Sequence, residues 1–353
     1  MRILSIGPMD GLSNTCLHRH WALTKYAGLI DVVNTSGVKS SLWYKISYHL
    51  FLYGIPIRVP ESNHENDNIR FLVDKNLYDL VWVDKGITIY PETLHYIKQK
   101  QPNAKLVSYS PDNMALRHNQ TQQYLESVPL YDYIITNKSY ILDDMRQLGA
   151  KNIYFVNNSY ETTFHHPRAL TEEDYKNYGA DVGFIGAWEQ ERCTSILYLV
   201  NHGIKVRVFG GGKWNDYKNY NSNLIVEGAG LRGEDYCKSL QATRINLCFL
   251  RKINFDQQTT RSVEIPACGG FMMAERTAEH LAMFEEGKEA AFFSNNEELL
   301  DKCSYYLAHE QERAVIAELG LKRCIASDYS NRGMIRNILK AIYGLSLIHI
   351  SEP

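Results

Sequence analysis

Short apolar runs alternate with longer segments of helical pattern along the first half of the chain. Turn-forming residues and proline mark the expected helix ends. Strands that alternate with helices of this length indicate βαβ units and a parallel sheet. The predicted strands of this half lie at 3–6, 30–34, 80–84, 106–110, 133–136 and 153–156. The clearest predicted helices are 14–27, with Asn14 as N-cap and Gly28 after it, 91–100, which begins at Pro91, and 138–148, which ends before Gly149.

The alternation stops in a polar stretch at 157–180 and then starts again. This stretch contains Asn-Asn, His-His-Pro and a tyrosine-rich charged run, so we interpret it as the passage between two domains. Beyond it the strand and helix patterns repeat, which predicts a second parallel sheet. The predicted elements of this half are strands at 181–186, 205–209, 223–226, 245–250, 271–274 and 290–293, and closing helices at 296–308, 311–326 and 331–343.

The pattern therefore predicts an α/β protein with two tandem Rossmann-like domains and a C-terminal helical segment. A length of 353 residues also fits two domains better than one core. The last residues, 345–353, fit no element and resemble translated adapter read-through. We interpret them as a non-native tail, with a frayed terminus as the alternative. The expected boundaries are 1–165 for the first domain, 166–180 for the connection, 181–328 for the second domain and 329–344 for the C-terminal helix.

Charge and cysteine content disfavour several classes of protein. The formal net charge of −2 gives no basic surface for nucleic acid. No apolar run is long enough for a transmembrane helix, and the run at the start is too short for a signal peptide. The seven cysteines are scattered without a C-x-x-C, which predicts reduced thiols in a cytoplasmic protein. The sequence leaves the oligomeric state open.

The two common phosphate-binding loops are absent. The loop from Gly7 to Asn14 lacks the G-x-G-x-x-G spacing that lets a backbone approach a dinucleotide. Gly210-Gly-Gly-Lys213 follows a predicted strand, but Trp214 stands where a P-loop needs Ser or Thr for Mg²⁺. These departures disfavour a nicotinamide enzyme and an NTPase.

Metal ligands are not grouped in the sequence either. No Asp-x-Asp pair ends a predicted strand, and His165-His166 lacks a third ligand at a suitable spacing. We therefore expect no metal site.

The segment 256–270 carries the most specific chemistry of the chain. Asp256 and Glu264 are eight positions apart, with a Thr-Thr-Arg-Ser run between them and a short helical pattern that ends at Gly-Gly. Backbone N–H groups at a helix start favour a phosphate, and Arg261 can neutralise a diphosphate. Glu264 can accept hydrogen bonds from a pair of sugar hydroxyls. Taken alone, the same residues are also ordinary helix punctuation in a βα unit.

Several separated segments resemble GT-B glycosyltransferases, and more narrowly the CgeB-like group. The segment 256–270 is similar to their Glu-x7-Glu donor motif, with Asp256 in place of the first Glu. The stretches 181–192 and 206–214 are similar to the first strand, the following loop and the glycine turn of the same domain. The resemblance covers about residues 181–330 and is weaker in the N-terminal half.

The resemblance implies a UDP- or GDP-linked sugar donor in the C-terminal domain and a glycosyl acceptor in the N-terminal domain. The nucleotide sugar is then a co-substrate, with no further cofactor and no metal. The donor-binding candidates are Gly186, Arg192, Gly211, Arg251, Thr259, Thr260, Arg261 and Glu264, and the catalytic candidates in this half are Asp256 and Glu264.

A general base for the acceptor hydroxyl is expected in the N-terminal half. Open α/β sheets bind ligands beyond the carboxyl ends of their strands, where four candidates lie. The residues leave the choice open, and we carry Asp112 forward as the catalytic candidate. The four are Gly11, Asp84, Asp112 and His118.

We therefore predict a metal-independent glycosyltransferase, with retention at the anomeric carbon favoured by the resemblance to Glu-x7-Glu enzymes. Two alternatives stay open. One is a GT-B-fold nucleotide-sugar epimerase, which needs a donor but no acceptor. The other is a non-catalytic nucleotide-sugar-binding or spore-coat assembly protein, because fold alone carries no substrate information.

Overall fold

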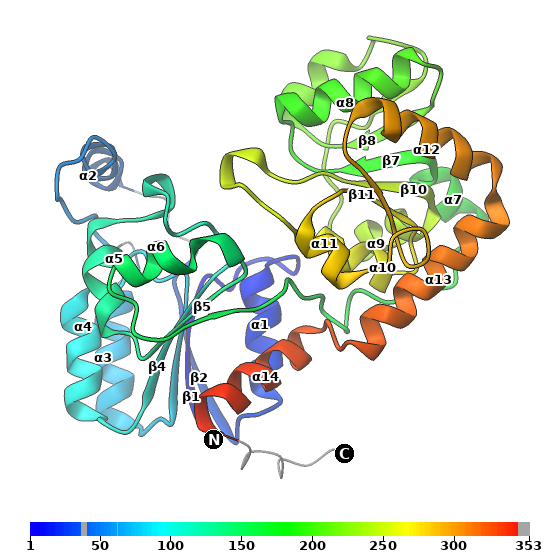
Figure 1. Cartoon of the computed structure of the whole chain (residues 1–353). Helices are drawn as coiled ribbons and strands as arrows, with labels where there is room; N and C mark the ends of the chain where they lie inside the picture. Colours follow the sequence, from blue (N-terminus) through cyan, green and yellow to red (C-terminus); the bar gives the residue numbers. More distant parts are fainter. Residues whose placement is uncertain (37–40, 62, 345–353) are drawn as a thin grey trace. The chain divides into compact units, whose positions relative to one another are not determined.

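The computed structural model describes residues 1–36, 41–61 and 63–344, so the expected tail at 345–353 lies outside the described residues. These residues form two compact units, one made of 1–157 with 332–344 and the other of 158–331. Each unit contains a six-stranded sheet, and the paired strands of both sheets are parallel. Helices cover both faces of each sheet (Figure 1). The predicted α/β class with two Rossmann-like domains is confirmed.

The sheet of the first unit has the strand order β2-β1-β3-β4-β5-β6. Its register places Ile6 of β1 beside Val33 of β2 and Val83 of β3, three apolar side chains in one row. The chain forms β1 (Arg2–Gly7), α1 (Thr15–Thr24), β2 (Leu29–Asn34), α2 (Leu42–Leu52), α3 (Glu65–Lys75), β3 (Leu80–Asp84), α4 (Pro91–Lys100), β4 (Lys105–Ser110), α5 (Gln122–Ser127), β5 (Tyr133–Thr136), α6 (Leu142–Gln147) and β6 (Ile153–Phe155), and after the second unit α14 (Asn331–Tyr343).

Two apolar cores enclose this sheet. On one face α3, α4 and α5 pack against alternate strand residues such as Leu4 and Val81. On the other face α1 and α14 pack against the intervening residues such as Ile3 and Trp82. Strands with both faces buried must be apolar at nearly every position, as β3 is. The last helix belongs to this core because Ile335, Ile338 and Ile342 lie on its buried side.

The sheet of the second unit has the strand order β12-β11-β10-β7-β8-β9. Helices α8 and α12 cover one face, and α9 and α10 cover the other. The elements are α7 (Glu172–Tyr178), β7 (Ala180–Ile185), α8 (Gln190–Asn201), β8 (Val206–Phe209), β9 (Leu224–Val226), α9 (Gly233–Ala242), β10 (Thr243–Cys248), α10 (Arg261–Ala267), β11 (Met272–Glu275), α11 (Ala278–Met283), β12 (Ala291–Phe293), α12 (Asn296–Ala308) and α13 (Glu310–Ala326).

The segment 158–180 differs from the expected connection. It belongs to the second unit, where it forms α7 and packs on α9. A capping box between Thr171 and Asp174 begins this helix. Asp174 also forms an ion pair of 2.9 Å with Lys238 of α9. A polar, tyrosine-rich stretch therefore became part of a domain through side-chain pairs with a distant helix, which its own pattern does not encode.

Candidate functional site

The carboxyl ends of β7, β8 and β10 lie side by side in the second sheet, because β7 is paired with both other strands. Parallel strands direct the loops that follow them to the same edge. These three loops contain Gly186, Gly211 and Arg251, and helix α10 follows the loop after β10. The structure thus gathers most of the predicted donor-binding residues at one edge of this sheet.

The start of α10 is anchored by a buried chain of hydrogen bonds. The Nδ1 of His280 is 2.6 Å from the carbonyl oxygen of Glu275, so it donates there, and its Nε2 accepts from the hydroxyl of Ser262 at 2.7 Å. The same hydroxyl oxygen accepts from the backbone N–H of Thr259 at 3.0 Å. Burial lowers the pKa of His280, which keeps the ring neutral and this pattern intact. Sequence reasoning missed His280, because its contact with Ser262 is tertiary.

The helix start expected to bind a phosphate belongs to a short helix. Helix α10 has only seven residues, and its N-cap Thr260 makes no side-chain cap hydrogen bond. Arginine side chains near this helix start add full positive charges to its partial charge.

Three of these arginines, Arg192, Arg251 and Arg261, act on one another. Burial lowers the pKa of Arg192; Glu189 opposes this shift, and the positive charges of Arg261 and Arg251 add to it. Glu189 lies 3.4 Å from the guanidinium groups of both Arg192 and Arg251, whereas Arg261 forms no ion pair in the described part of the chain. Arg192 and Arg251 thus share one carboxylate, and Arg261 adds a third positive charge to the cluster. Like charges held this close favour the binding of an anion.

Two donors of this cluster are unused. The Nε atoms of Arg192 and Arg261 are buried and have no hydrogen-bond partner among the described residues. An unsatisfied buried N–H of a charged group is costly, and a ligand oxygen would remove that cost. The cluster therefore has both the charge and the free donors that a diphosphate requires.

Glycines make room for the cluster. A Cβ on Gly186 would lie 2.8 Å from Cζ of Phe184 and 3.3 Å from Nη2 of Arg261. Only a residue without a side chain fits between these two groups. The carbonyl of Gly186 also accepts a hydrogen bond of 3.0 Å from the indole N–H of Trp214, which fixes the glycine turn after β8. Gly211 lies in that turn, where a Cβ would be 3.3 Å from the carbonyl oxygen of Gly228.

Glu264 is nearly buried within α10, at 8% exposure. Its Oε2 accepts a hydrogen bond of 2.6 Å from the hydroxyl of Tyr236 on α9. Its Oε1 lies 3.8 Å from Nε2 of His165, which the segment before α7 supplies. Burial and the Glu264 carboxylate together raise the pKa of Tyr236, so its hydroxyl keeps the proton that it donates. No sequence pattern marked either neighbour, beyond the His165-His166 doublet.

Two further residues of this segment, Asp256 and Lys252, lie in the loop between β10 and α10. Asp256 is partly buried in the loop before α10, and its backbone N–H donates to the carbonyl of Arg251 at 3.2 Å. Lys252 forms an ion pair with Glu275 at the end of β11, so its charge is already used within the unit.

The first unit has a cavity of about 270 Å³ at the carboxyl edge of its own sheet, lined by the ends of β1 and β3. Two of the predicted carboxylates lie at this edge with different partners. Asp84 is bonded through both oxygens to the buried Arg19, at 2.6 and 2.8 Å. Asp112 forms a partly exposed ion pair of 2.7 Å with Lys85, which lines the cavity. Asp112 is therefore the more accessible of the two.

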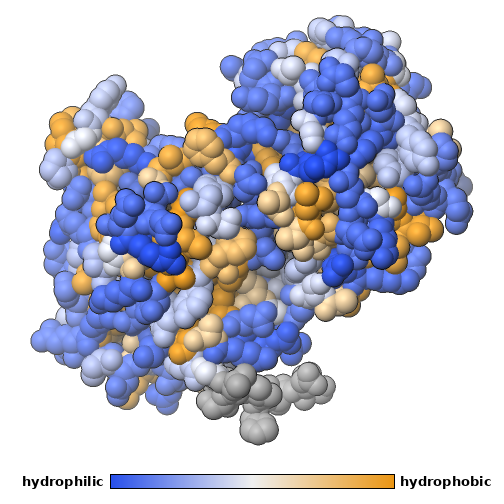
Figure 2. Space-filling view, viewed as in Figure 1, coloured by the Kyte–Doolittle hydropathy of each residue, from blue (hydrophilic) through white to orange (hydrophobic). Residues whose placement is uncertain are grey.

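The remaining two candidates of the first unit are open to solvent. Gly11 has a φ of 88° and no atom within 4 Å of its would-be Cβ. His118 is exposed, and its carbonyl accepts a hydrogen bond from the hydroxyl of Tyr48 on α2. Helix α2 also supplies Tyr44 to the cavity and carries exposed apolar side chains (Figure 2). Leu42, Trp43 and Ile46 are the most exposed of these within the helix.

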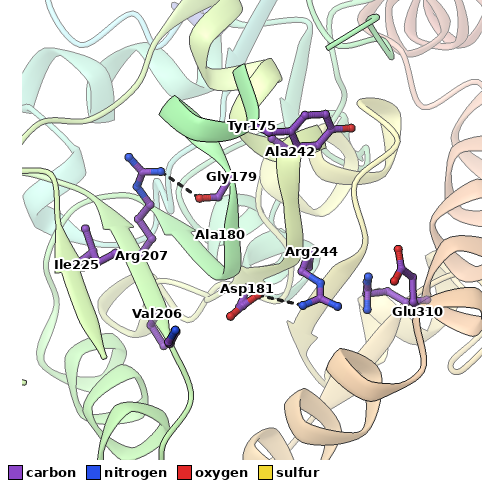
Figure 3. Close-up of a pocket in the computed structure, with 12 residues that line it drawn as sticks. Tyr175, Gly179, Ala180, Asp181, Val206, Arg207, Ile225, Ala242, Arg244 and Glu310 are labelled. Atoms are coloured by element: carbon purple, nitrogen blue, oxygen red, sulfur yellow. Dashed lines mark hydrogen bonds and ion pairs between the residues drawn. The ribbon is translucent and has the colours of Figure 1, made fainter. Parts of the chain in front are cut away.

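A larger cavity, of about 520 Å³, lies at the opposite edge of the second sheet (Figure 3). It is lined by the amino ends of β7 and β8, and its arginines already have partners within the unit. Arg207 donates to the carbonyl of Gly179 at 3.0 Å, and Arg244 pairs with Asp181 at 3.0 Å. Arg313 donates to the carbonyl of Tyr306 at the end of α12. These cations cap helix ends, so we assign the chemistry to the carboxyl edge.

Groups of side chains that could hold a metal are rare. One such group, Glu61, His64 and Asp67, lies in the first unit with its ligand atoms within 4.8 Å of one another. Glu61 there already accepts hydrogen bonds of 2.8 and 2.7 Å from Asn66. The second unit, all of which the structure describes, contains no group of this kind.

Among the helices that the structure describes, none combines the length and the apolar character needed to cross a bilayer.

The family match lies mostly within the second unit. Residues 193–340 match the model of a glycosyl transferase-like family. No curated protein sequence matches the chain. This family match runs from within α8 through most of α14 and includes Arg251, Arg261 and Glu264, whereas Arg192 lies one position before it.

Solved structures resemble the whole chain. Anabaena Alr3699/HepE, solved in complex with UDP-glucose, is 14% identical over 98% of this chain and 100% of that one, with a TM-score of 0.63. Sucrose-phosphate synthase from Thermosynechococcus elongatus is 11% identical over 98% and 99%, with a TM-score of 0.65. A putative UDP-N-acetylglucosamine 2-epimerase from Listeria monocytogenes is 11% identical over 97% and 95%, with a TM-score of 0.60. The chain thus has the GT-B fold of two Rossmann-like domains, and its residues 193–340 match the glycosyl transferase-like family.

Proposed function

We propose that the protein is a metal-independent glycosyltransferase that uses a UDP- or GDP-linked sugar as donor. The observation that carries this proposal is the arginine cluster at the carboxyl edge of the second sheet, with unused buried Nε–H groups on Arg192 and Arg261. A diphosphate would supply the negative charge and the acceptors that these groups lack. The family match over 193–340 supports the same reaction class, and the sequence resemblance supports the narrower CgeB-like group.

The reaction breaks the bond between the anomeric carbon and the diphosphate oxygen, and the acceptor oxygen forms a new bond to that carbon. The acceptor hydroxyl loses its proton to a base, and the diphosphate leaves with an added negative charge. Arg192 and Arg261 would stabilise that charge in the partly buried site, where fixed cations act most strongly. The resemblance to Glu-x7-Glu enzymes favours retention of configuration.

UDP-glucose is the first donor to test, because a structural neighbour of the same fold was solved with it. The acceptor would bind the cavity of about 270 Å³ in the first unit, with Asp112 as the candidate base. The seven cysteines are buried and free, which supports a cytoplasmic enzyme. A thermal-shift screen of nucleotide sugars would identify the donor, because a ligand that binds only the folded state raises the midpoint.

Glu264→Gln tests the donor site. The neutral amide should weaken donor binding by roughly 1–3 kcal/mol, because a charged acceptor of the sugar hydroxyls is lost. Isothermal titration calorimetry with the donor found by the screen measures this change. Glu318→Gln, an exposed glutamate paired with Lys322 on α13, is the matched control and should bind as the wild type does. Equal affinity of Glu264→Gln and the wild type would refute the assignment.

Turnover should survive an excess of EDTA. The arginine cluster provides the positive charge that a divalent metal supplies in metal-dependent transferases, and no metal-ligand group lies in the second unit. Initial rates with and without EDTA, followed by addition of Mg²⁺ or Mn²⁺, check this expectation. Loss of activity with EDTA and its return with either metal would overturn metal independence.

Two other functions fit the same donor site. An epimerase would convert the nucleotide sugar without any acceptor, and one neighbour of this fold is named as a putative epimerase. A binding protein would hold the donor without turnover. Incubating the donor alone and analysing the sugar by chromatography or NMR separates the three, because only an epimerase yields a new nucleotide sugar under these conditions.

A further inference from the structure

Two neighbouring side chains, those of Tyr236 and His165, lie against the carboxylate of Glu264. The Tyr236 hydroxyl is bonded to Oε2 at 2.6 Å, a short distance that is typical of a charge-assisted O–H···O⁻ bond. The His165 ring faces Oε1, with its Nε2 at 3.8 Å. The two rings also contact each other in an edge-on arrangement with centroids 6.1 Å apart. Glu264 is thus held by residues of α9 and of the segment before α7.

The backbone determines which nitrogen of His165 carries the proton. The N–H of Glu161 donates to Nδ1 of His165 at 3.0 Å, so Nδ1 must present its lone pair. In the neutral ring the proton then lies on Nε2, the atom that faces Glu264. His165 is 5% exposed, and this backbone contact keeps its ring from turning. The tautomer is therefore set to direct a donor toward the carboxylate.

We infer that Tyr236 and His165 are positioning residues, which orient Glu264 so that it accepts hydrogen bonds from the two ribose hydroxyls of the nucleotide. This inference rests on the proposed function. It goes beyond that function by assigning roles to two residues outside the donor motif. Through Glu264, they would make the site distinguish ribonucleotides from deoxyribonucleotides.

The count of acceptor positions explains why two donors help. An ionised carboxylate has about four lone-pair positions, two on each oxygen. Tyr236 occupies one on Oε2, and the His165 ring faces one side of Oε1, with its Nε2 at 3.8 Å and so outside hydrogen-bond distance. One position on each oxygen remains, which matches a pair of neighbouring hydroxyls. Without the two donors the carboxylate can rotate about its last bond, and the paired geometry is lost.

Nucleotide binding tests the inference directly. The wild type should bind UDP roughly tenfold more tightly than 2′-deoxy-UDP, a ratio that corresponds to about 1.4 kcal/mol. Tyr236→Phe should weaken UDP binding by roughly tenfold and 2′-deoxy-UDP binding by less than about twofold, which removes the discrimination. His165→Gln should act in the same direction by roughly three- to fivefold, since its distance to Glu264 is longer. Calorimetry on the full chain measures all of these values, with GDP and 2′-deoxy-GDP if the wild type prefers guanine.

Matched controls separate positioning from folding. Tyr178→Phe removes a similar tyrosine-to-carboxylate bond, to Asp235 at 2.7 Å, and should leave both affinities unchanged. His166 is next to His165 in the chain but is exposed, so His166→Gln should also leave both affinities unchanged. In the Glu264→Gln background, Tyr236→Phe should change UDP affinity by less than about twofold, because a residue that acts through Glu264 has nothing left to orient.

The binding measurements distinguish a failure of this inference from a failure of the proposed function. A wild type that discriminates, with Tyr236→Phe and His165→Gln variants that keep the same ratio of affinities, overturns the inference and leaves the proposed function standing. Equal weakening of both nucleotides with a lowered melting temperature assigns the two residues a structural role, and it also overturns the inference. A wild type that binds no nucleotide refutes the proposed function itself.

Discussion

Replacing Arg261 with alanine should lower turnover by about 100- to 1,000-fold while raising the apparent KM for the donor far less. Arg261 forms no ion pair within the described residues, and its Nε–H is buried without a partner. Charge on the diphosphate grows as the glycosidic bond breaks, so a cation aimed at it contributes more in the transition state than in the ground state. Steady-state kinetics on the purified variant measure the two effects separately.

Arg192→Ala should lower turnover in the same way as Arg261→Ala does, and it should also lower the stability of the protein. Its guanidinium lies 5.8 Å from the centre of the Phe184 ring and is mostly buried, so Arg192→Ala also removes packing in the core. We therefore expect a lowered melting temperature for this variant and an unchanged one for Arg261→Ala. Lysine at either position should restore only part of the rate, because a point charge does not reproduce the planar fork of arginine.

Arg244→Ala is the matched control for both substitutions. Arg244 lies at the opposite edge of the same sheet, paired with Asp181. It should keep kcat and KM within a factor of about two, which corresponds to roughly 0.4 kcal/mol. If Arg261→Ala and Arg192→Ala also stay within that factor while folded, the cluster does not face the leaving group and the proposed mechanism is wrong.

Asp84→Ala should destabilise the first unit by about 3–5 kcal/mol, the usual cost of leaving one partner of a buried ion pair alone. The side chains of Arg19 and Asp84 are only 5% and 3% exposed and share two hydrogen bonds. Arg19 also lies 4.2 Å from the centre of the Tyr109 ring. Burial alone lowers the pKa of Arg19, but Asp84 outweighs it and the net shift is upward. A guanidinium keeps its proton in proteins, so Asp84→Ala leaves an uncompensated charge in the core.

Denaturant unfolding followed by tryptophan fluorescence measures this loss, because Trp82 is buried and stacks on Tyr109 in the same core. Asp143→Ala breaks an exposed pair with Arg146 in the same unit and should leave the midpoint unchanged. The double variant Arg19→Met/Asp84→Leu should be more stable than Asp84→Ala alone, because no uncompensated charge remains. An unfolding midpoint of Asp84→Ala equal to that of the wild type would show that the pair is not buried in solution.

The ion pair between Arg19 and Asp84 also favours Asp112 over Asp84 as the general base. Both oxygens of Asp84 are engaged by Arg19, whereas Asp112 is partly exposed beside Lys85. From the sequence these two aspartates are equivalent, since both follow a buried strand of the first sheet. Only the position of Arg19 on α1, 65 residues before Asp84, distinguishes them.

The sequence by itself determined the two parallel sheets and the sheet edge at which the proposed donor-binding residues lie. Strands such as β3 are apolar at successive positions and are separated by helical patterns, and burial on both faces requires that pattern. The positions of Gly186 after β7 and of Arg251 and Arg261 after β10 then place them at one sheet edge, because parallel strands end on the same side. These features depend on local periodicity and on chain order, which the sequence carries directly.

The tertiary structure alone decided which groups meet at that edge. Tyr236 and His165 reach Glu264 from elements 28 and 99 positions earlier in the chain, and no local pattern marks them. Thr260, a plausible cap by residue type, makes no cap, while His280 anchors the helix start through Ser262. Side-chain pairs of this kind depend on distances between elements, and packing sets those distances after the local patterns have fixed the elements themselves.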